Sequence, residues 1–320
     1  MTKVLLTGAN GFVGNNIVPV LLEKGYEVRG QVRDMDKAKM RLGELANNTD
    51  LELVVADVTN RASMEDVCDG VDAIIHTVAI AIEKGDATYE EINYQGTINV
   101  VDAAEAKGVK RFINMSQNGA DASLPYRFLK SKGKAQEYVA SSNLDWTALR
   151  PSAIFGPQDE FFNSFARLVQ LTPFVFPLVA NGEPTFQPIS VYDVAEATVR
   201  CLDDDSTIGK ELVLGGPEVL SMEEIEMRVL GAIGERRLMF NAPVGLLRPA
   251  VFVMENVFAS PPVTSSLLEL LAVPNTVEDN AIVNHFGMEP IPFEGEHIEY
   301  LNNANVSDTL TQFFTGKVPR

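Results

Sequence analysis

The chain has 320 residues, of which 46% are hydrophobic, so it can bury the core of one large or two medium domains. Its formal net charge is −18 and its isoelectric point about 4.6, which argues against a nucleic-acid partner because such a protein needs a basic face. Two cysteines, Cys68 and Cys201, stand far apart, so no disulfide framework is expected and a cytoplasmic location fits best.

The first predicted elements are a strand, a tight turn and a helix. An apolar run ends at Thr7, glycines follow at positions 8, 11 and 14, and an amphipathic stretch continues to Lys24. Gly8 allows a sharp turn, Gly11 lets backbone approach a pyrophosphate, and Gly14 lets the helix lie close to the sheet. Free N–H groups at the helix start then face the phosphates. The residues predicted to hold them are Thr7, Gly8, Asn10, Gly11, Phe12, Val13 and Gly14.

Strands and helices alternate through the first half of the chain. The predicted strands are 3–7, 27–32, 51–56, 73–77, 111–115 and 146–150, and the predicted helices are 11–24, 36–45, 63–68, 89–107 and 128–142. Strands apolar at every position are buried on both faces, as in a parallel sheet. The alternation predicts a doubly wound α/β fold.

The pattern changes after Pro151. Aromatic residues and prolines cluster between positions 155 and 177, which indicates a lid or substrate region in a smaller C-terminal lobe. Ordinary core packing between the two domains is the alternative for the aromatic stretch 155–176. A helix is expected over 193–202, a strand over 211–214, and a helix that opens with a capping box at Ser221–Glu224. The apolar stretch 244–259 is too short and too interrupted to span a bilayer, so a buried or substrate-covering helix is predicted. No transmembrane segment or signal peptide is expected.

The end of the second predicted strand bears on which dinucleotide binds. An NAD site places an acidic side chain there on the ribose 2′-hydroxyl. Here Val32 takes that place and Arg33 follows, and a guanidinium would pair with a 2′-phosphate. Asp34 would supply the carboxylate after a one-residue shift. NADP is therefore the preferred cofactor, with NAD as the alternative.

Further candidate cofactor contacts follow the third and fourth strands. Asp57, beside Val58, is placed to accept from the adenine amino group, although it could instead cap the next turn. The small residues Thr77, Val78 and Ala79 would let backbone lie along the cofactor. His76 reads as a packed, hydrogen-bonded histidine. No Cys or His cluster has metal-ligand spacing, so no metal site is expected.

These residues resemble the short-chain dehydrogenase/reductase superfamily, in its extended or atypical branch. The motifs that carry the resemblance are Thr7–Gly14, Asn93–Thr97, Leu149–Pro157 and Gln187–Ala195. Within the branch, the chain is most similar to relatives of the NAD(P)H-binding accessory subunit of respiratory complex I. The resemblance implies a Rossmann domain of residues 1–150 with about 183–218, and a substrate lobe of 151–182 with about 219–320. It also implies cofactor contacts from Asn93, Lys132, Pro151, Ser152, Ala153 and Ile154.

The family's chemistry uses a Ser or Thr, a Tyr and a Lys. Two frames fit the tyrosine motif: Tyr126 with Lys130, or Phe128 with Lys132, and the second fits the downstream helix better. Phenylalanine carries no proton. The active hydroxyl position holds Gln117, and Ser116 precedes it. The candidate catalytic residues are Lys132, Tyr126 and Ser116.

Two functions remain open at this level. One is an NADP(H)-dependent oxidoreductase or epimerase-type enzyme for an apolar small molecule, with an atypical site. The other is a catalytically silent nucleotide-binding structural or sensor protein. Relatives often dimerise through a bundle that would include helices 89–107 and 128–142, which makes a homodimer an expected partner state.

Overall fold

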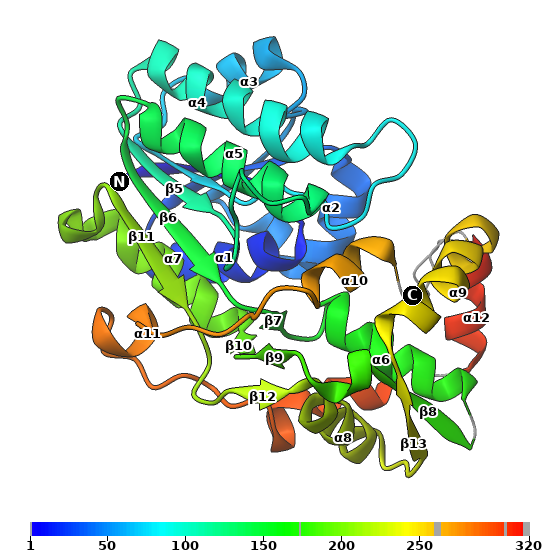
Figure 1. The fold of residues 1–320 in the computed structure, drawn as a ribbon. Coiled ribbons are helices and arrows are strands. Elements are labelled where there is room, and N and C mark those ends of the chain that lie inside the picture. The colour runs from blue at the N-terminus through cyan, green and yellow to red at the C-terminus, as the bar shows by residue number, and fades with distance from the viewer. Residues whose placement is uncertain (1, 173, 259–263, 304–305, 316–320) are drawn as a thin grey trace. The chain divides into compact units, whose positions relative to one another are not determined.

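A seven-stranded parallel sheet organises the first unit of this computed structural model, which describes residues 2–172, 174–258, 264–303 and 306–315 (Figure 1). The sheet order is β11-β6-β5-β4-β1-β2-β3. Its strands are β1 (Lys3–Thr7), β2 (Glu27–Val32), β3 (Leu51–Val55), β4 (Ala73–His76), β5 (Arg111–Met115), β6 (Asp145–Pro151) and β11 (Lys210–Leu214). The order reverses at β1, where Thr7 lies in register with Gln31 of β2 and with His76 of β4. Ligands bind at such a switch point, beyond the carboxyl ends of the strands.

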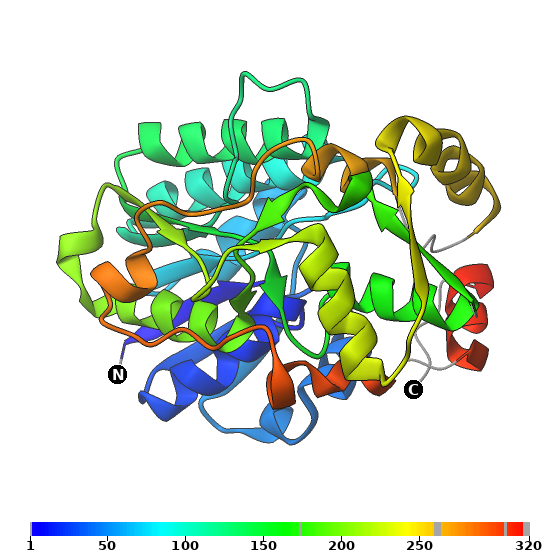
Figure 2. The same cartoon turned by 60° about the horizontal axis from the view of Figure 1, so that its bottom comes forward.

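Helices cover both faces of this sheet. Helices α3, α4 and α5 lie on one face and α1 and α7 on the other, and the turned view in Figure 2 separates the two layers. The bounds are α1 (Phe12–Glu23), α2 (Met35–Leu42), α3 (Arg61–Cys68), α4 (Gly96–Lys107), α5 (Arg127–Ser141), α7 (Val191–Asp203) and α11 (Ala281–Asn284). Short 3-10 turns occupy Gly43–Asn47 and Asp205–Thr207, and a π-helical turn, Glu90–Gln95, precedes α4.

The predicted doubly wound parallel α/β fold is confirmed. The strands lie where the sequence places them, and their ends shift by no more than about a residue. The predicted helix 36–45 breaks at Gly43, whose φ of 57° ends the α-helix. The predicted helix 89–107 is interrupted by the π-helical turn.

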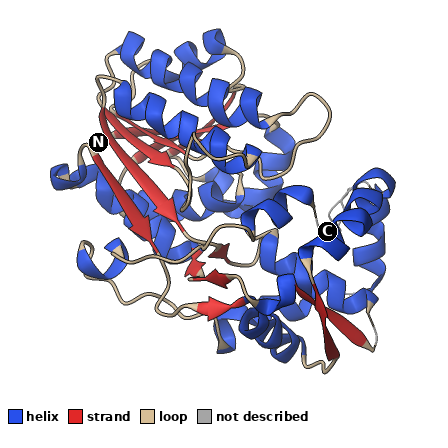
Figure 3. Cartoon of the chain, in the orientation of Figure 1, coloured by secondary structure: helices blue, strands red, loops and turns tan. Residues whose placement is uncertain are grey.

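The second unit comprises Ser152–Ser190, Gly215–Glu278 and Glu289–Arg320. Its described residues form three two-stranded sheets, drawn in red in Figure 3: β7 (Ile154–Phe155) with β10 (Ile189–Ser190), β9 (Thr185–Phe186) with β12 (Leu220–Ser221), and β8 (Val175–Val179) with β13 (Leu238–Ala242). Its helices are α6 (Phe161–Leu171), α8 (Met222–Ile233), α9 (Val244–Val257), α10 (Ser265–Leu270) and α12 (Val306–Thr315), with 3-10 turns at Ala180–Gly182 and Gly295–Asn303.

The first unit includes two segments from the second half of the chain. One is shorter than the resemblance implied, and the resemblance did not imply the other. The segments that return to the sheet are Val191–Leu214 and Asp279–Met288, where about 183–218 was expected. Arg111 of β5 anchors the first of these, because its guanidinium donates to the carbonyl of Cys201 at the end of α7. His285 of the second pairs with Asp204 at 2.8 Å.

The aromatic stretch after Pro151 forms the core of the second unit. Phe155 and Phe162 are buried, and their rings meet Phe293 at centroid distances of 5.1 and 4.4 Å. Phe161 and Phe162 begin α6, a helix that the sequence analysis did not predict.

The helix predicted over 244–259 is present as α9, but its described part is not buried throughout, and its covering of a substrate stays a prediction. Helix α9 buries Val251, but Phe252, Val253 and Val257 are exposed. Ala259 lies outside the described residues. Among the described residues, no helix has the length and apolarity to cross a bilayer.

Glu226 is a buried acid within the apolar core of the second unit. It lies on α8 and accepts a hydrogen bond from the Val179 N–H of β8 at 3.1 Å. Among the described residues, nothing contacts its second carboxyl oxygen by a hydrogen bond. Burial raises the pKa of Glu226 to about 8, so the carboxyl is neutral at pH 7.

This burial predicts a loss of stability as the pH rises from acid to about 8. The folded-state pKa lies above the unfolded value of about 4.5, so the stabilising effect is complete below pH 4.5 and is lost as the pH rises through about 8. We expect Glu226→Gln to flatten the fall in melting temperature between pH 6 and 9. The control is Glu289→Gln, which removes an exposed carboxylate elsewhere in the second unit. Equal slopes in the three proteins would contradict the prediction.

Candidate dinucleotide-binding site

The loop after β1 has the geometry of a phosphate cradle. Gly8 turns the chain with a φ of 71°, and the Gly11 N–H donates to its carbonyl at 2.8 Å. Helix α1 then starts at Phe12, with Gly11 as its N-cap, no side-chain cap and no acidic residue in its first turn. The first N–H groups of this helix are therefore left for an anion.

Glycine is required at position 14 because helix α1 touches the end of β1. A Cβ on Gly14 would lie 2.1 Å from the Gly8 carbonyl oxygen, and one on Gly11 would lie 3.1 Å from the same atom. Gly8 itself faces Thr77 and Val78, whose side chains would lie 3.2 and 3.1 Å from its Cβ. These glycines therefore let the turn, the start of α1 and the segment after β4 pack more closely than larger residues would allow.

Gln31 braces this loop from β2, a role that the sequence analysis missed. Its amide oxygen accepts from the Gly8 N–H at 3.0 Å, and its amide nitrogen donates to the Ala56 carbonyl. Strand β2 also contains Glu27 and Arg29, so the sequence alone did not single out Gln31. A buried polar group in such a strand needs partners, and here they are backbone groups at the ligand-facing edge.

The end of β2 presents Arg33 to solvent and uses Asp34 locally. Val32 is buried, as the last residue of the strand. The Asp34 carboxylate caps α2 by accepting from the Lys37 N–H at 3.1 Å, and it also pairs with the Lys37 ammonium at 3.4 Å. Arg33 is exposed, and the described residues give it no ion pair. The carboxylate is thus committed to the helix, and the guanidinium is available.

Asp57 and Val58 shape the turn after β3. One Asp57 carboxylate oxygen accepts from both the N–H and the hydroxyl of Thr59, each at 2.9 Å, which is the capping role. Val58 is buried against Gly96, where a Cβ would lie 2.8 Å from the valine methyl group. Gly96 of the Asn93–Thr97 motif is therefore a packing glycine.

Thr7 and Asn93 turn their side chains into the protein. The Thr7 hydroxyl lies 2.8 Å from His76 Nδ1, and Asn93 is bonded through its amide to both backbone groups of Ile80. Both side chains are therefore occupied by hydrogen bonds inside the protein. Any contact from Thr7 to a cofactor would use its backbone. His76 is fully buried; this burial and the nearby Lys132 lower the pKa of His76 to about 3, so the ring is neutral.

Helix α5 places Phe128 and Lys132 on its buried face. Tyr126 is the N-cap residue outside the helix, and Lys130 is exposed. Phe128 packs edge-on against Tyr89, with ring centroids 5.6 Å apart. The frame that pairs Phe128 with Lys132 therefore has both residues on one side of the helix.

Lys132 is a buried amine held by backbone. Its Nζ donates to the Met115 carbonyl at the end of β5, at 2.6 Å. Burial lowers the pKa of Lys132 to about 8. Ser116 is also buried, and its hydroxyl donates to Gln136. Gln136, one turn beyond Lys132, is a second residue that the sequence analysis missed.

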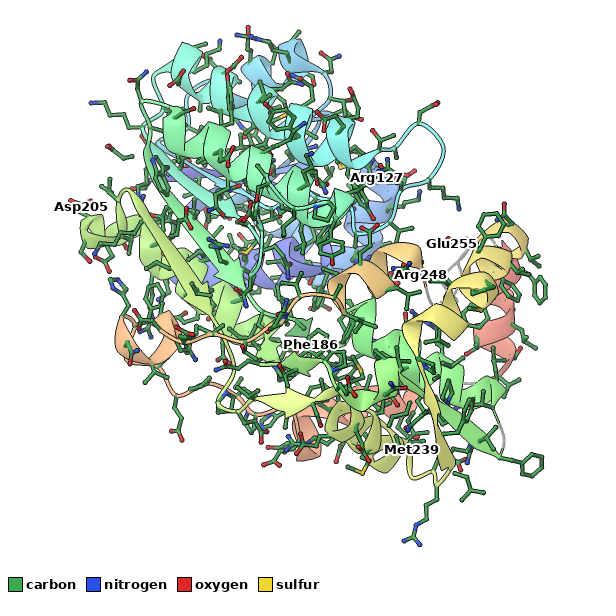
Figure 4. All side chains as sticks on the ribbon, viewed as in Figure 1. Arg127, Phe186, Asp205, Met239, Arg248 and Glu255 are labelled. Atoms are coloured by element: carbon green, nitrogen blue, oxygen red, sulfur yellow. The ribbon has the colours of Figure 1, made fainter. Side chains whose placement is uncertain are left out.

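The loop that joins β5 to α5 is fixed against that helix. A Cβ on Gly133 would lie 2.3 Å from the Ala122 nitrogen. The Asp121 N–H donates to the Leu129 carbonyl at 3.3 Å, and the Arg150 guanidinium donates to the Ala120 carbonyl at 3.0 Å. At the start of α5, Arg127, labelled in Figure 4, pairs with Glu83 at 2.7 Å.

The remaining predicted cofactor contacts follow β6, with Pro151 as its last residue and Ser152–Ile154 in the second unit. Asn275 organises them there. Its amide oxygen accepts from the Ser152 hydroxyl at 2.6 Å and from the Ala153 N–H at 3.0 Å. Asn275 lies far along the chain in an irregular segment, and no sequence motif marked it.

The glycine cradle at a sheet switch point defines a nucleotide-binding protein with a Rossmann-like fold. Residues 8–205 match the model of the NAD(P)H-binding family, and the chain belongs to that family. The features of the extended or atypical short-chain dehydrogenase/reductase branch agree with this assignment.

Its relatives include both respiratory subunits and enzymes. The chain is 28% identical over 305 residues to NADH dehydrogenase [ubiquinone] 1 alpha subcomplex subunit 9 of Arabidopsis thaliana, covering 92% of this chain and 76% of that protein. It is 29% identical over 268 residues to a 3 beta-hydroxysteroid dehydrogenase/Delta 5→4-isomerase of Mycobacterium tuberculosis, covering 73% and 70%.

Solved structures share the fold. A nucleoside-diphosphate-sugar epimerase from Staphylococcus aureus aligns with a TM-score of 0.72 at 17% identity, covering 95% of this chain and 100% of that one. The Bordetella bronchiseptica enzyme WbmH, in complex with NAD+, aligns with a TM-score of 0.66 at 20% identity, covering 95% and 97%.

The different surroundings of Gly14 and Gly231 predict that alanine substitutions at these two positions change the free energy of unfolding in opposite directions. Gly14→Ala forces a methyl group onto the Gly8 carbonyl, so we expect it to abolish dinucleotide binding and to lower the free energy of unfolding by about 2 kcal/mol or more. Gly231→Ala in α8 meets nothing within 4 Å and should raise it by about 0.5–1 kcal/mol. Urea denaturation and calorimetric titration measure both. Unimpaired dinucleotide binding by Gly14→Ala would contradict the assignment of the glycine turn as the phosphate-binding site.

Proposed function

We propose that this chain is an NADP(H)-dependent oxidoreductase for an apolar carbonyl or related small molecule. The observation that carries the proposal is the uncapped start of α1 together with a buried lysine, Lys132, on α5. The resemblance to a hydroxysteroid dehydrogenase supports an apolar substrate. A bound nicotinamide would supply the hydride.

Within this proposal, Lys132 binds the nicotinamide ribose and keeps a proton available. Phe128 stands where the family has its tyrosine and cannot donate a proton. With its pKa lowered to about 8, the Lys132 ammonium can exchange its proton near neutral pH. Tyr126, at the N-terminus of the same helix, is the second candidate donor, and Ser116 would have to leave Gln136 to take part.

The second candidate function is a catalytically silent nucleotide-binding protein. Phe128 and Gln117 at the two hydroxyl positions favour it, as does the similarity to a respiratory complex subunit. In this case the dinucleotide would stabilise the fold by mass action alone. Turnover by the unmodified chain separates the two functions.

The two lysines of α5 give a matched test of the enzymatic proposal. With a panel of apolar ketones and NADPH, we expect Lys132→Met to lower kcat/KM by about a hundredfold or more, since it removes the acid and the ribose contact. Lys130→Met removes an exposed ammonium two residues away and should leave the rate unchanged. No turnover by the unmodified chain, together with a rise in melting temperature on adding NADPH, would favour the silent protein.

The preference for NADP rests on Arg33. We expect the unmodified chain to bind NADPH more tightly than NADH, and Arg33→Ala to weaken NADPH binding by about tenfold with little effect on NADH. Arg41→Ala removes another exposed arginine, on α2, and serves as the control. Fluorescence titration measures all the affinities. Equal affinities that Arg33→Ala leaves unchanged would refute the preference.

A further inference from the structure

The segment Thr77–Ile80, which follows β4, is held at both ends by side chains. At one end, the Thr77 N–H donates to Thr7 Oγ1 at 3.2 Å, and the Thr77 hydroxyl donates to the Thr7 carbonyl at 2.7 Å. At the other end, the Asn93 amide accepts from the Ile80 N–H at 2.8 Å and donates to the Ile80 carbonyl at 3.2 Å. Four backbone groups and three side chains, those of Thr7, Thr77 and Asn93, therefore fix its path.

His76 and Thr97 connect these two anchors. Thr7 Oγ1 lies 2.8 Å from His76 Nδ1, and His76 Nε2 lies 3.1 Å from Thr97 Oγ1. The Thr97 hydroxyl donates to the Asn93 carbonyl at 2.7 Å. All of these groups are buried, so each hydrogen bond has little competition from water.

The partners determine where every proton lies. A carbonyl only accepts, so the single Thr97 proton goes to Asn93, and His76 Nε2 must donate to Thr97. In a neutral ring, Nδ1 then accepts the Thr7 proton, which leaves a Thr7 lone pair for the Thr77 N–H. The hydrogen bonds form one directed chain from Thr77 to Asn93.

We propose that His76, as the Nε2-protonated neutral imidazole, is a positioning residue for the dinucleotide site. It couples the segment Thr77–Ile80 to the end of β1 and to the start of α4, and so sets the wall that faces Gly8. Thr77 and Val78 border the glycine turn, so a shift of this segment changes the space in the cradle. The inference rests on the proposed function, because it assumes that the cradle takes a dinucleotide.

A valine scan at two buried threonines tests this role. Thr97→Val keeps the side-chain shape but leaves His76 Nε2–H and the Asn93 carbonyl without their partner. We expect it to weaken NADPH binding by about tenfold. Thr147→Val is the matched control, because Thr147 is equally buried on β6 and its hydroxyl donates to the Thr207 carbonyl, outside the chain of hydrogen bonds. It should lower thermal stability without changing the NADPH affinity.

Two further measurements exclude a merely structural role. Thr97→Ser restores the hydroxyl and should restore the affinity. Two-dimensional NMR of the histidine ring nitrogens should show the Nε2–H tautomer in the unmodified chain and in Thr97→Ser, and its loss or a mixture in Thr97→Val.

The outcomes are distinguishable. If the unmodified chain binds NADPH and Thr97→Val binds it equally well, the inference fails and the proposed cofactor site stands. An Nδ1–H tautomer in the unmodified chain also overturns the inference. If the unmodified chain binds neither NADPH nor NADH, the proposed function fails and the inference fails with it.

Discussion

The close contact between Gly14 and the Gly8 carbonyl is the constraint on which the candidate site depends. It brings the start of α1 against the end of β1, at the point where the strand order reverses. The amides of the first helical turn then face the same edge as the ends of β2 and β4. A methyl group at position 14 would separate helix and strand, and every other contact of the cradle would move with them.

Two polar side chains beside the glycine turn, one on β1 and one on β2, hold this arrangement in place. Gln31 reaches the loop from β2, and Thr7 connects it to β4 through His76. These groups are polar and buried, and each forms a hydrogen bond to a defined donor or acceptor. The edge of the sheet is thus preorganised by hydrogen bonds, whereas the strands beneath it are held by apolar packing.

The first half of the fold could be predicted from its periodicity, because apolar strands alternate with amphipathic helices and glycines separate them. The glycine cradle, Arg33 and Lys132 could be proposed as site residues because each falls at a strand end or on a motif. Gln31, Gln136 and Asn275 could not, since their roles come from partners that only the folded chain brings near. Helix α6 could have been predicted, because Phe162, Phe165, Ala166 and Val169 have the spacing of one buried helix face. The interpretation of this segment as a lid rested on its aromatic and proline composition instead. Helix α9 could be predicted as a helix, but composition alone does not tell which of its apolar side chains remain exposed.

The fixed loop between β5 and α5 has a consequence for how this protein can select what it binds. Gly133 packs against its backbone, and hydrogen bonds from Asp121 and Arg150 keep it on the helix and the sheet. The loop is already ordered, so binding a molecule against it would cost little conformational entropy of the loop. Selectivity at the β5–α5 loop would then come from shape complementarity to a rigid surface, without any induced fit.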